Sequence, residues 1–447
     1  MNEVKVDFSK KCGKMKPMHA VNNGPVHKFT LDQRISNLQW FIDAGIPYAR
    51  THDAAFYSTY GGEHTVDIHA IFPDFDKDAN DPESYDFACT DEYLRVMDAA
   101  GVKPFYRLGS KIEHGVKKYG TVPPKDFYKW SVICEHIICH YTEGWADGFN
   151  YDIEYWEIWN EPDCQNANGT NLCWQGTEEQ FIDMFCIALK HLKKCFPHLK
   201  IGGPAFTHVN ERYAKLLFDE IKKRGLTLDF FSWHLYAYDA AWVAHEAYHA
   251  RRFLDENGFK NTESILNEWN YVRGWTNDDW IYTLKREKDI KGAAFIASAI
   301  CDCQYAPLDM LMYYDARPCG MNGLFAQDIP SERLKGYYSL KMFNELYKLG
   351  ESAKIDIDGK DIYGCAAGNS EKYAVMVSYF NDDDNLGSTA ASVDLSGITD
   401  VTGKRAKVYL LDREHDMELV REESIDGSTA QLTLDMPLFS AYLIVIE

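Results

Sequence analysis

The feature that most constrains the fold of this chain is a regular alternation of short apolar strands and helices between residues 18 and 349. Strands that alternate with helical segments pair in parallel, because each helix supplies the crossover connection. The predicted strands are 18–22, 46–51, 102–108, 155–159, 200–204, 228–236, 264–268 and 309–315. The predicted helices are 30–44, 90–100, 127–141, 178–194, 210–224, 240–257, 289–301 and 332–349. Eight such units predict an α/β fold, a closed (β/α)8 TIM barrel.

The pattern changes after Gly350, where helical periodicity gives way to short alternating strands separated by Gly, Asp and Ser turns. This pattern predicts a C-terminal β-sandwich domain. Its predicted strands are 354–357, 362–366, 373–379, 406–411, 431–434 and 440–446. An early strand at 4–8 lies outside the barrel series. We therefore predict three segments: an N-terminal strand of the sandwich (1–13), a barrel (14–350) and a sandwich domain (351–447).

Charge and cysteine content limit the class of partner and the compartment. The net charge of −21 disfavours nucleic acid and acidic membrane surfaces as partners. No apolar run is long enough to span a bilayer, and the N-terminus lacks the apolar segment of a secretory leader, although the sequence leaves open whether a leader was removed. Twelve Cys without a CxxC pair favour a reduced, cytoplasmic protein. His245 and His249 lie four residues apart on the predicted helix 240–257, with Glu246 beside His245. Glu246 is more simply interpreted as surface charge than as the base of a zinc site, so neither a metal nor a cofactor is predicted.

Two glutamates end predicted barrel strands in similar contexts. Glu161 follows the strand 155–159 in the sequence WNEP, and Glu268 ends the strand 264–268 in the sequence LNEW. Pro162 cannot donate a hydrogen bond to a sheet, so pairing should stop next to Glu161. Active sites of (β/α)8 barrels lie at the carboxyl ends of the strands. Two carboxyl groups at that end are what glycoside hydrolysis requires, one as proton donor and one as nucleophile.

The residues beside Glu161 have distinct expected roles. Asn160 could hydrogen-bond the sugar hydroxyl next to the anomeric carbon, a contact that strengthens in the transition state. Glu157 lies four residues earlier on the same face of the strand and therefore deeper in the barrel. Because a buried carboxylate needs a cation, Arg50 or Arg107 on neighbouring strands is expected to pair with Glu157.

The strand 228–236 places His234 and Tyr236 on one face. A tyrosine hydroxyl next to Glu268 would hold that carboxylate oriented and ionised through a hydrogen bond. His234 has two interpretations from sequence, a substrate-binding residue or a core histidine with its hydrogen bonds satisfied.

These motifs resemble the glycoside hydrolases of clan A. The opening VKVDFSKKCGKMKPMHAVNNGPV, the strand YARTHD and the C-terminal strands are similar to family 39, the β-xylosidase and α-L-iduronidase family. The resemblance implies a retaining enzyme with Glu161 as acid/base and Glu268 as nucleophile, and it places the family's Arg-x-His pattern on Arg50 and His52. Departures are Asn267 in place of Thr before the nucleophile, Ala237 in place of Pro after His-x-Tyr, and Tyr313 and Tyr314 in place of Trp on the last strand.

The loops after the last barrel strands carry more aromatic side chains than cations. Candidate sugar-stacking residues are Trp275, Tyr314 and Phe325. Trp280 in the same loops and Trp174 after the fourth strand could also stack on a sugar. The cations in these loops are Arg273, Lys285 and Arg317, for which solvent exposure is the simpler interpretation. A uronide carboxylate in a pocket needs a buried cation, so this composition favours a neutral sugar.

The first hypothesis is therefore a retaining, exo-acting hydrolase of a neutral, xyloside-like β-glycoside, with an oligosaccharide or a small glycoside as substrate. The alternatives are a hydrolase of another glycoside (uronide, arabinoside, glucoside or galactoside) and a non-catalytic carbohydrate-binding barrel. A non-catalytic barrel would be expected to lack Asn160, Glu161 or Glu268, and all three are present. The sequence leaves open the sugar, the linkage, exo versus endo action and the oligomeric state.

Overall fold

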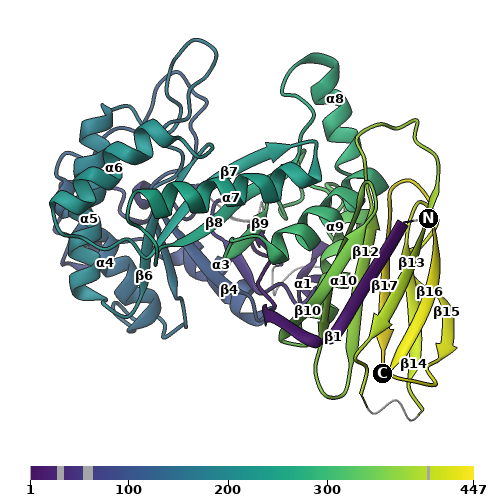
Figure 1. Cartoon of the computed structure of the whole chain (residues 1–447). Helices are drawn as coiled ribbons and strands as arrows, with labels where there is room; N and C mark the ends of the chain where they lie inside the picture. The colour runs from purple at the N-terminus through teal and green to yellow at the C-terminus, as the bar shows by residue number, and fades with distance from the viewer. Residues whose placement is uncertain (1, 28–34, 54–63, 400–402) are drawn as a thin grey trace.

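The computed structural model describes residues 2–27, 35–53, 64–399 and 403–447, and it confirms the barrel (Figure 1). Eight parallel strands close into a barrel in sequence order, from β2 to β9. They are β2 (Ala20–Asn22), β3 (Tyr48–Arg50), β4 (Lys103–Leu108), β5 (Tyr155–Ile158), β6 (Lys200–Phe206), β7 (Phe230–Ala237), β8 (Glu263–Tyr271) and β9 (Met310–Tyr313). Parallel strands buried on both faces explain the nearly continuous apolar runs of the sequence.

Helices connect the strands and cover the outside of the barrel. They are α1 (Leu38–Ala44), α3 (Ala88–Ala99), α4 (Phe127–Thr142), α5 (Glu178–Cys195), α6 (Glu211–Lys223), α7 (Ala240–Glu256), α9 (Ile290–Tyr305) and α10 (Lys335–Tyr347). Shorter insertions are α2 (Ile68–Ile71), the 3-10 helix η3 (Pro82–Ser84) and α8 (Asn277–Arg286). Within the described ranges, no helix has the length and apolar content needed to cross a membrane.

Two helices differ from the sequence prediction. The predicted helix 30–44 begins in the described structure only at Leu38, and its first residues, 30–34, lie outside the described residues. Asn37 stands at the N-cap of α1, where its side-chain oxygen accepts from the Val26 backbone N–H instead of capping the helix. α8 was not predicted. It lies in the loop that follows β8 and carries a single buried residue, Thr283.

The barrel interior is layered along its axis. An apolar layer from the first halves of the strands fills the amino end, formed by Ala20, Phe105, Tyr155, Phe230, Ile265, Met310 and Met312. Above it lies a hydrogen-bonded polar layer around Arg50 and Glu157, both fully buried. The apolar layer leaves no room for solvent from below, so the carboxyl end of the barrel is where a ligand can enter.

The remaining strands form one mixed, nine-stranded sheet. A β-sandwich has two separate sheets, so this sheet differs from the predicted arrangement. Its order is β15 (Asp416–Ser424), β14 (Arg405–Leu411), β17 (Ser440–Ile446), β12 (Tyr373–Tyr379), β11 (Ile362–Gly368), β10 (Glu351–Asp358), β1 (Asn2–Lys14), β13 (Thr389–Ser396) and β16 (Thr429–Met436). Side chains from both ends of the sheet share one core, so the sheet folds over itself as a sandwich does. Sequence analysis missed β13 and β15.

The first strand of the chain lies inside this C-terminal sheet (Figure 1). β1 pairs antiparallel with β10 and parallel with β13. The β10–β11 pairing, by contrast, is short, with Ser352 opposite Ala367. β1 therefore holds β13 and β16 to the rest of the sheet.

The sheet packs on the barrel through α9 and α10, which lie between the two in Figure 1. The hydroxyls of Ser298 and Ser378 are hydrogen-bonded across this contact at 2.8 Å. Near the carboxyl end of β8, the Tyr271 hydroxyl donates to Asp382 of the sheet domain (2.6 Å), and Lys291 forms an ion pair with the same carboxylate (2.9 Å). The sheet thus supports the strand that carries Glu268.

Candidate active site

Glu161 and Glu268 both lie at the carboxyl end of the barrel. Glu161 follows β5 on a backbone in the left-handed region, with φ of 76° at Trp159 and 45° at Glu161. Such a conformation costs about 1–2 kcal/mol per non-glycine residue and persists because surrounding contacts hold it. Here the Trp159 N–H donates to the Leu108 carbonyl (2.8 Å), and the Glu161 N–H donates to the Ala205 carbonyl (2.9 Å).

The two carboxyl groups meet around His234. His234 Nδ1 lies 2.7 Å from Glu161 Oε1 and 3.5 Å from Glu268 Oε2. One carboxylate oxygen of each glutamate and one ring nitrogen of His234 all lie within 4.8 Å of one another. This separation suits two carboxyls that act on the same anomeric carbon, about 5–5.5 Å apart, better than the wider spacing of inverting enzymes.

Arg50 is the cation at the centre of the site. Its guanidinium donates to Glu268 Oε1 (2.7 Å), Glu157 Oε2 (2.6 Å) and Asn160 Oδ1 (2.6 Å). The Asn160 Nδ2 is buried without a hydrogen-bond partner in the described structure. Arg50 thus holds the side-chain amide of Asn160 in place and leaves the Asn160 Nδ2 group free to donate to a ligand.

Glu157 forms the floor of the site, as the sequence predicted. Its cation is Arg50, because Arg107 pairs with Asp67 instead (2.6 Å). Ser232 and Asn267 also donate to Glu157 Oε1, at 2.6 and 2.5 Å. Every partner of this buried carboxylate is therefore a hydrogen-bond donor, which offsets part of its desolvation cost.

The role of Asn267 was missed in the sequence because it depends on a bulge. In the β7–β8 pairing, Trp233 lies opposite Leu266 and His234 opposite Glu268, so Asn267 is skipped. A bulge lets two successive side chains face the same way, which strict alternation forbids. Asn267 and Glu268 therefore both point into the barrel.

The surroundings of the two glutamates differ. Burial, and then the nearby Asp163 carboxylate, raise the pKa of Glu161 to about 7. Glu268 instead accepts from Arg50 and from the Tyr236 hydroxyl (2.9 Å). Burial lowers the pKa of His234 to about 4, so its ring is neutral near pH 7. The pair thus combines one carboxyl that holds its proton near neutral pH with one held by a cation and a hydroxyl.

A belt of charged residues beside His52 was also missed. His52 lies 3.6 Å from Glu268 through Nε2 and 3.2 Å from Asp53 through Nδ1. Asp53 also pairs with Lys111 (2.9 Å) and Arg317 (3.3 Å). Arg317 was expected to be exposed, but its side chain is 17% exposed and lies 3.4 Å from Asp315 as well. These residues lie far apart in the sequence, so no local sequence pattern predicts that they meet.

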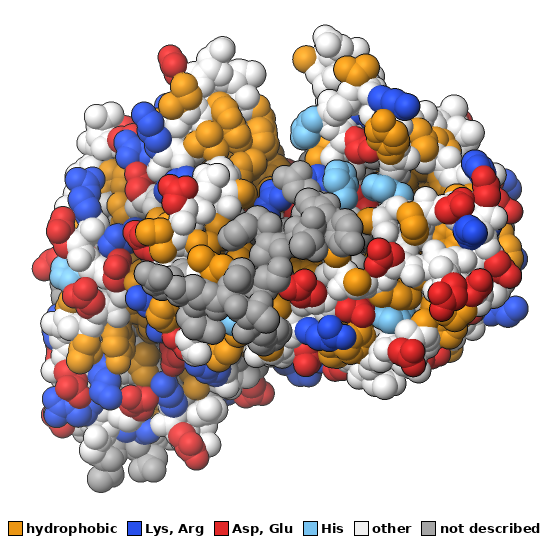
Figure 2. Space-filling model, turned by 180° about the vertical axis from the view of Figure 1, so that it is seen from behind, with side chains coloured by type: hydrophobic (Ala, Val, Ile, Leu, Met, Phe, Trp, Pro, Cys, Tyr) orange, Lys and Arg blue, Asp and Glu red, His pale blue; other side chains and the backbone are white. Residues whose placement is uncertain are grey.

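The predicted aromatic residues separate into a rim group and a core group. The ring centre of Tyr314 lies 5.6 Å from that of His52 and 6.4 Å from that of Tyr236. The ring centre of the half-exposed Trp275 lies 5.0 Å from that of Tyr236. Trp275 also lines a cavity of about 470 Å³ between the β7–α7 and β8–α8 loops. Figure 2 shows a notch at this end of the molecule with hydrophobic side chains gathered on one wall.

The prediction for Phe325 was wrong. Its side chain is 3% exposed and stacks on Phe41 of α1 with ring centres 5.7 Å apart. Trp174 is likewise buried, against Trp159 and Phe181. Both loops turn back to the barrel wall, and burying a large ring there is more favourable than leaving it at the rim.

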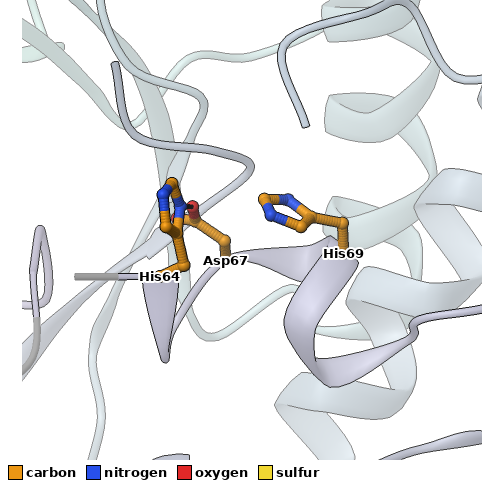
Figure 3. A group of neighbouring side chains, drawn as sticks. All are labelled: His64, Asp67 and His69. Atoms are coloured by element: carbon orange, nitrogen blue, oxygen red, sulfur yellow. Dashed lines mark hydrogen bonds and ion pairs between the residues drawn. The ribbon is translucent and has the colours of Figure 1, made fainter. Parts of the chain in front are cut away.

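Several side-chain groups have the composition of a metal site. Figure 3 shows one of them, in which His64 and His69 approach Asp67. Asp67 is already neutralised by Arg107, and His64 Nδ1 lies 2.7 Å from its other oxygen. A second group joins Glu161 with Cys164 and Cys173, and a third joins Glu135 with His191 and Cys195.

A (β/α)8 barrel with two neighbouring carboxyl groups at the carboxyl end of its strands has the site of a glycoside hydrolase. Residues 3–314 match the family described as glycosyl hydrolases family 39. The chain belongs to glycoside hydrolase family 39.

Relatives at low identity agree with this assignment. A β-xylosidase of Caldicellulosiruptor saccharolyticus is 24% identical over 412 residues, covering 84% of this chain and 78% of that protein. A β-xylosidase of Geobacillus stearothermophilus is 24% identical over 213 residues, which is 45% of this chain and 40% of that one.

Solved structures share the whole fold. A glucosidase from Croceicoccus marinus superposes with a TM-score of 0.81 at 20% identity, covering 100% of this chain and 98% of that one. A monomeric β-xylosidase from Caulobacter crescentus superposes with a TM-score of 0.71 at 14% identity, covering 100% and 99%. At these identities the likeness concerns the fold.

Proposed function

We propose that this family 39 enzyme is a retaining, exo-acting glycosidase that releases a neutral β-linked sugar of the xylose kind by double displacement. Glu161 is the acid/base and Glu268 the nucleophile. The observation that carries the proposal is the pair of carboxyls whose oxygens lie within 4.8 Å around His234. That spacing is closer to the distance of about 5–5.5 Å in retaining enzymes than to the roughly 6.5–9.5 Å of inverting enzymes.

In the first step, Glu268 Oε attacks the anomeric carbon while the bond from that carbon to the leaving oxygen breaks. Glu161 gives its proton to the leaving oxygen, so the aglycone departs as an alcohol. A glycosyl ester on Glu268 results. In the second step Glu161, now a carboxylate, accepts a proton from water as the water oxygen attacks the anomeric carbon. The ester bond breaks, and both carboxyls return to their starting states.

The neighbours fit these two roles. Burial and Asp163 keep Glu161 protonated up to a pH of about 7, where it can donate. Arg50 and Tyr236 hold Glu268 in a fixed position by hydrogen bonds of 2.7 and 2.9 Å. The buried Asn160 Nδ2 can donate to the hydroxyl next to the anomeric carbon.

The charge balance of the site supports a neutral sugar. Lys111 and Arg317 are the cations of the belt beside His52, and both are paired with the Asp53 carboxylate, at 2.9 and 3.3 Å. Arg273 is 43% exposed and lies over the Tyr282 ring. A uronide carboxylate would have to displace one of these pairings. The names of the two sequence relatives point to β-xylosides among neutral substrates.

Two variants test the roles. Glu268→Ala should nearly abolish turnover, and added azide should then yield a glycosyl azide of inverted configuration. Glu161→Ala should slow glycosides with poor leaving groups by about 10²–10⁴-fold and activated aryl glycosides far less. Glu256→Ala, an exposed acid at the end of α7, is the matched control and should behave as the parent. A Glu161→Ala effect of less than about tenfold on a poor leaving group would refute the acid/base role.

A panel of nitrophenyl glycosides tests the sugar. It contains the β-xyloside, β-glucoside, β-galactoside, α-L-arabinosides and uronides. We expect the highest kcat/KM on the β-xyloside. Fastest turnover of a uronide, lost in Arg317→Ala or Arg273→Ala, would contradict the neutral-sugar proposal. Absence of turnover on every glycoside, with the fold intact, would favour a carbohydrate-binding barrel.

A further inference from the structure

The segment that follows Glu161 brings two cysteines back to it. The chain forms a small hairpin in which Gln165 pairs with Asn171, and the Leu172 N–H donates to the Cys164 carbonyl (2.9 Å). At one end, the Cys164 N–H donates to the Glu161 carbonyl (3.0 Å). At the other, the Cys173 carbonyl accepts from Trp159 Nε1 (2.9 Å). Both ends of the hairpin are thus tied to the turn that carries Glu161.

This arrangement gathers three metal-ligand atoms. The Cys164 Sγ, the Cys173 Sγ and a Glu161 carboxylate oxygen all lie within 4.8 Å of one another. On a tetrahedral Zn²⁺, with Zn–S near 2.3 Å and Zn–O near 2.1 Å, such atoms lie about 3.5–3.8 Å apart. Closing the group on an ion therefore needs small side-chain movements only.

The chemistry of the group favours a thiophilic ion. Two thiolates and a carboxylate are ligands that select Zn²⁺ or Cd²⁺ over Mg²⁺ or Ca²⁺. Cys173 is buried, whereas Cys164 and Glu161 are partly exposed and open a route from solvent. The nearby Asp163 carboxylate adds negative charge, which attracts a cation to this group.

The other two groups are poorer sites by the same criteria. In the group of Figure 3, Asp67 is engaged by Arg107 at 2.6 Å, and an added cation would face that guanidinium. The Glu135–His191–Cys195 group offers one thiol, against the two of Cys164 and Cys173.

We propose that Cys164, Cys173 and Glu161 form a binding site for a thiophilic divalent metal ion, and that occupancy of this site inhibits the enzyme. On binding, each thiol releases its proton to the solvent, and so does the Glu161 carboxyl where it is protonated, so that two thiolates and one carboxylate become ligands. A ligated Glu161 cannot donate a proton to a leaving group. The inhibition rests on the proposed role of Glu161, whereas the binding does not.

Binding is tested first, on the full chain in a non-thiol reductant with Cd²⁺ as the probe. Absorbance of the thiolate–Cd²⁺ bond reports occupancy without any turnover, and we expect one tight site per chain. Cys164→Ser and Cys173→Ser should each weaken binding by more than about 100-fold, since loss of an outer-shell partner alone costs about 10–100-fold. Glu161→Gln should weaken it too, and Cys195→Ser, which removes the thiol of the third group, should leave it unchanged.

Inhibition is tested on a glycoside with a poor leaving group, whose hydrolysis needs the proton from Glu161, with each variant normalised to its own metal-free rate. The parent and Cys195→Ser should be inhibited by Cd²⁺ and recover with a chelator, and the Cys164 and Cys173 variants should resist. Binding that persists in both of these variants, or no binding in the parent, overturns the proposal. Inhibition that persists in both would place the ion on the Glu161–His234–Glu268 group and also overturn it. Tight binding without inhibition would refute the role of Glu161 while retaining the site.

Discussion

The central prediction concerns Arg50, which holds the floor of the site and the nucleophile together. Arg50→Met removes the cation bonded to Glu157 at 2.6 Å and to Glu268 at 2.7 Å. Glu157 is fully buried, so its charge would be left uncompensated. Breaking a buried ion pair in this way costs about 3–5 kcal/mol, because one partner stays charged in a low dielectric.

A second variant separates the fold from the chemistry. Arg50→Met/Glu157→Gln removes both charges, and replacing a whole buried pair is close to neutral for stability. The double variant should therefore recover the stability that was lost at Glu157. It should not recover activity, because Glu268 still lacks its cation. Loss of a hydrogen bond to a charged group costs about 1.5–3 kcal/mol, which predicts about a 10- to 150-fold loss of kcat/KM.

The assay combines chemical denaturation followed by circular dichroism with kcat/KM on an aryl glycoside below the unfolding transition. Arg107→Met is the matched control, since Arg107 is equally buried and pairs with Asp67 at 2.6 Å. It should cost similar stability with a smaller loss of activity, because its partners are Asp67 and the His52 carbonyl. A double variant as unstable as Arg50→Met, or one with full activity, would refute the reasoning.

Three further predictions follow from other contacts. The pKa of Glu161, raised to about 7 by burial and Asp163, should give kcat/KM an alkaline limb near pH 7, and Asp163→Asn should move that limb to lower pH; an unmoved limb would exclude Glu161 as its source. Deletion of residues 1–11 should lower the thermal midpoint by removing the strand between β10 and β13, and an unchanged midpoint would contradict that pairing. Burial raises the pKa of Glu287 to about 8, so the protonated form is favoured by folding and its stabilising effect is lost as pH rises from about 4.5 through 8. Glu287→Gln should therefore gain stability over the parent as pH rises, by at most about 5 kcal/mol, and a gain independent of pH in denaturation curves would refute it.

The sequence alone determined the elements whose signal is local. Parallel strands covered on both faces are apolar throughout, and packed helices show an apolar stripe, so the barrel could be predicted from residues 18–349. Glu161 and Glu268 could be identified because each stands at the end of such a strand. A buried carboxylate needs a cation, so the partner of Glu157 could be narrowed to Arg50 or Arg107.

Tertiary structure decided which of the candidates meet. Trp275 and Phe325 look alike as loop aromatics, yet Trp275 is half exposed at the rim and Phe325 is buried on Phe41. The bulge that turns Asn267 inward depends on the register of β7 against β8, which is a property of two strands rather than of one. The single nine-stranded sheet depends on the pairing of β1 with β13, almost 390 residues apart, as between Asn2 and Ala391.

The same distinction applies to the charged groups around the site. Asp53, Lys111 and Arg317 come from three separate loops, and Cys173 returns to Glu161 only through the hairpin that follows it. Periodicity and strand ends are properties of neighbouring residues, which the sequence displays directly. Contacts between distant segments form only when the strands and helices of the barrel pack together. Their stability depends on the whole barrel rather than on any one segment.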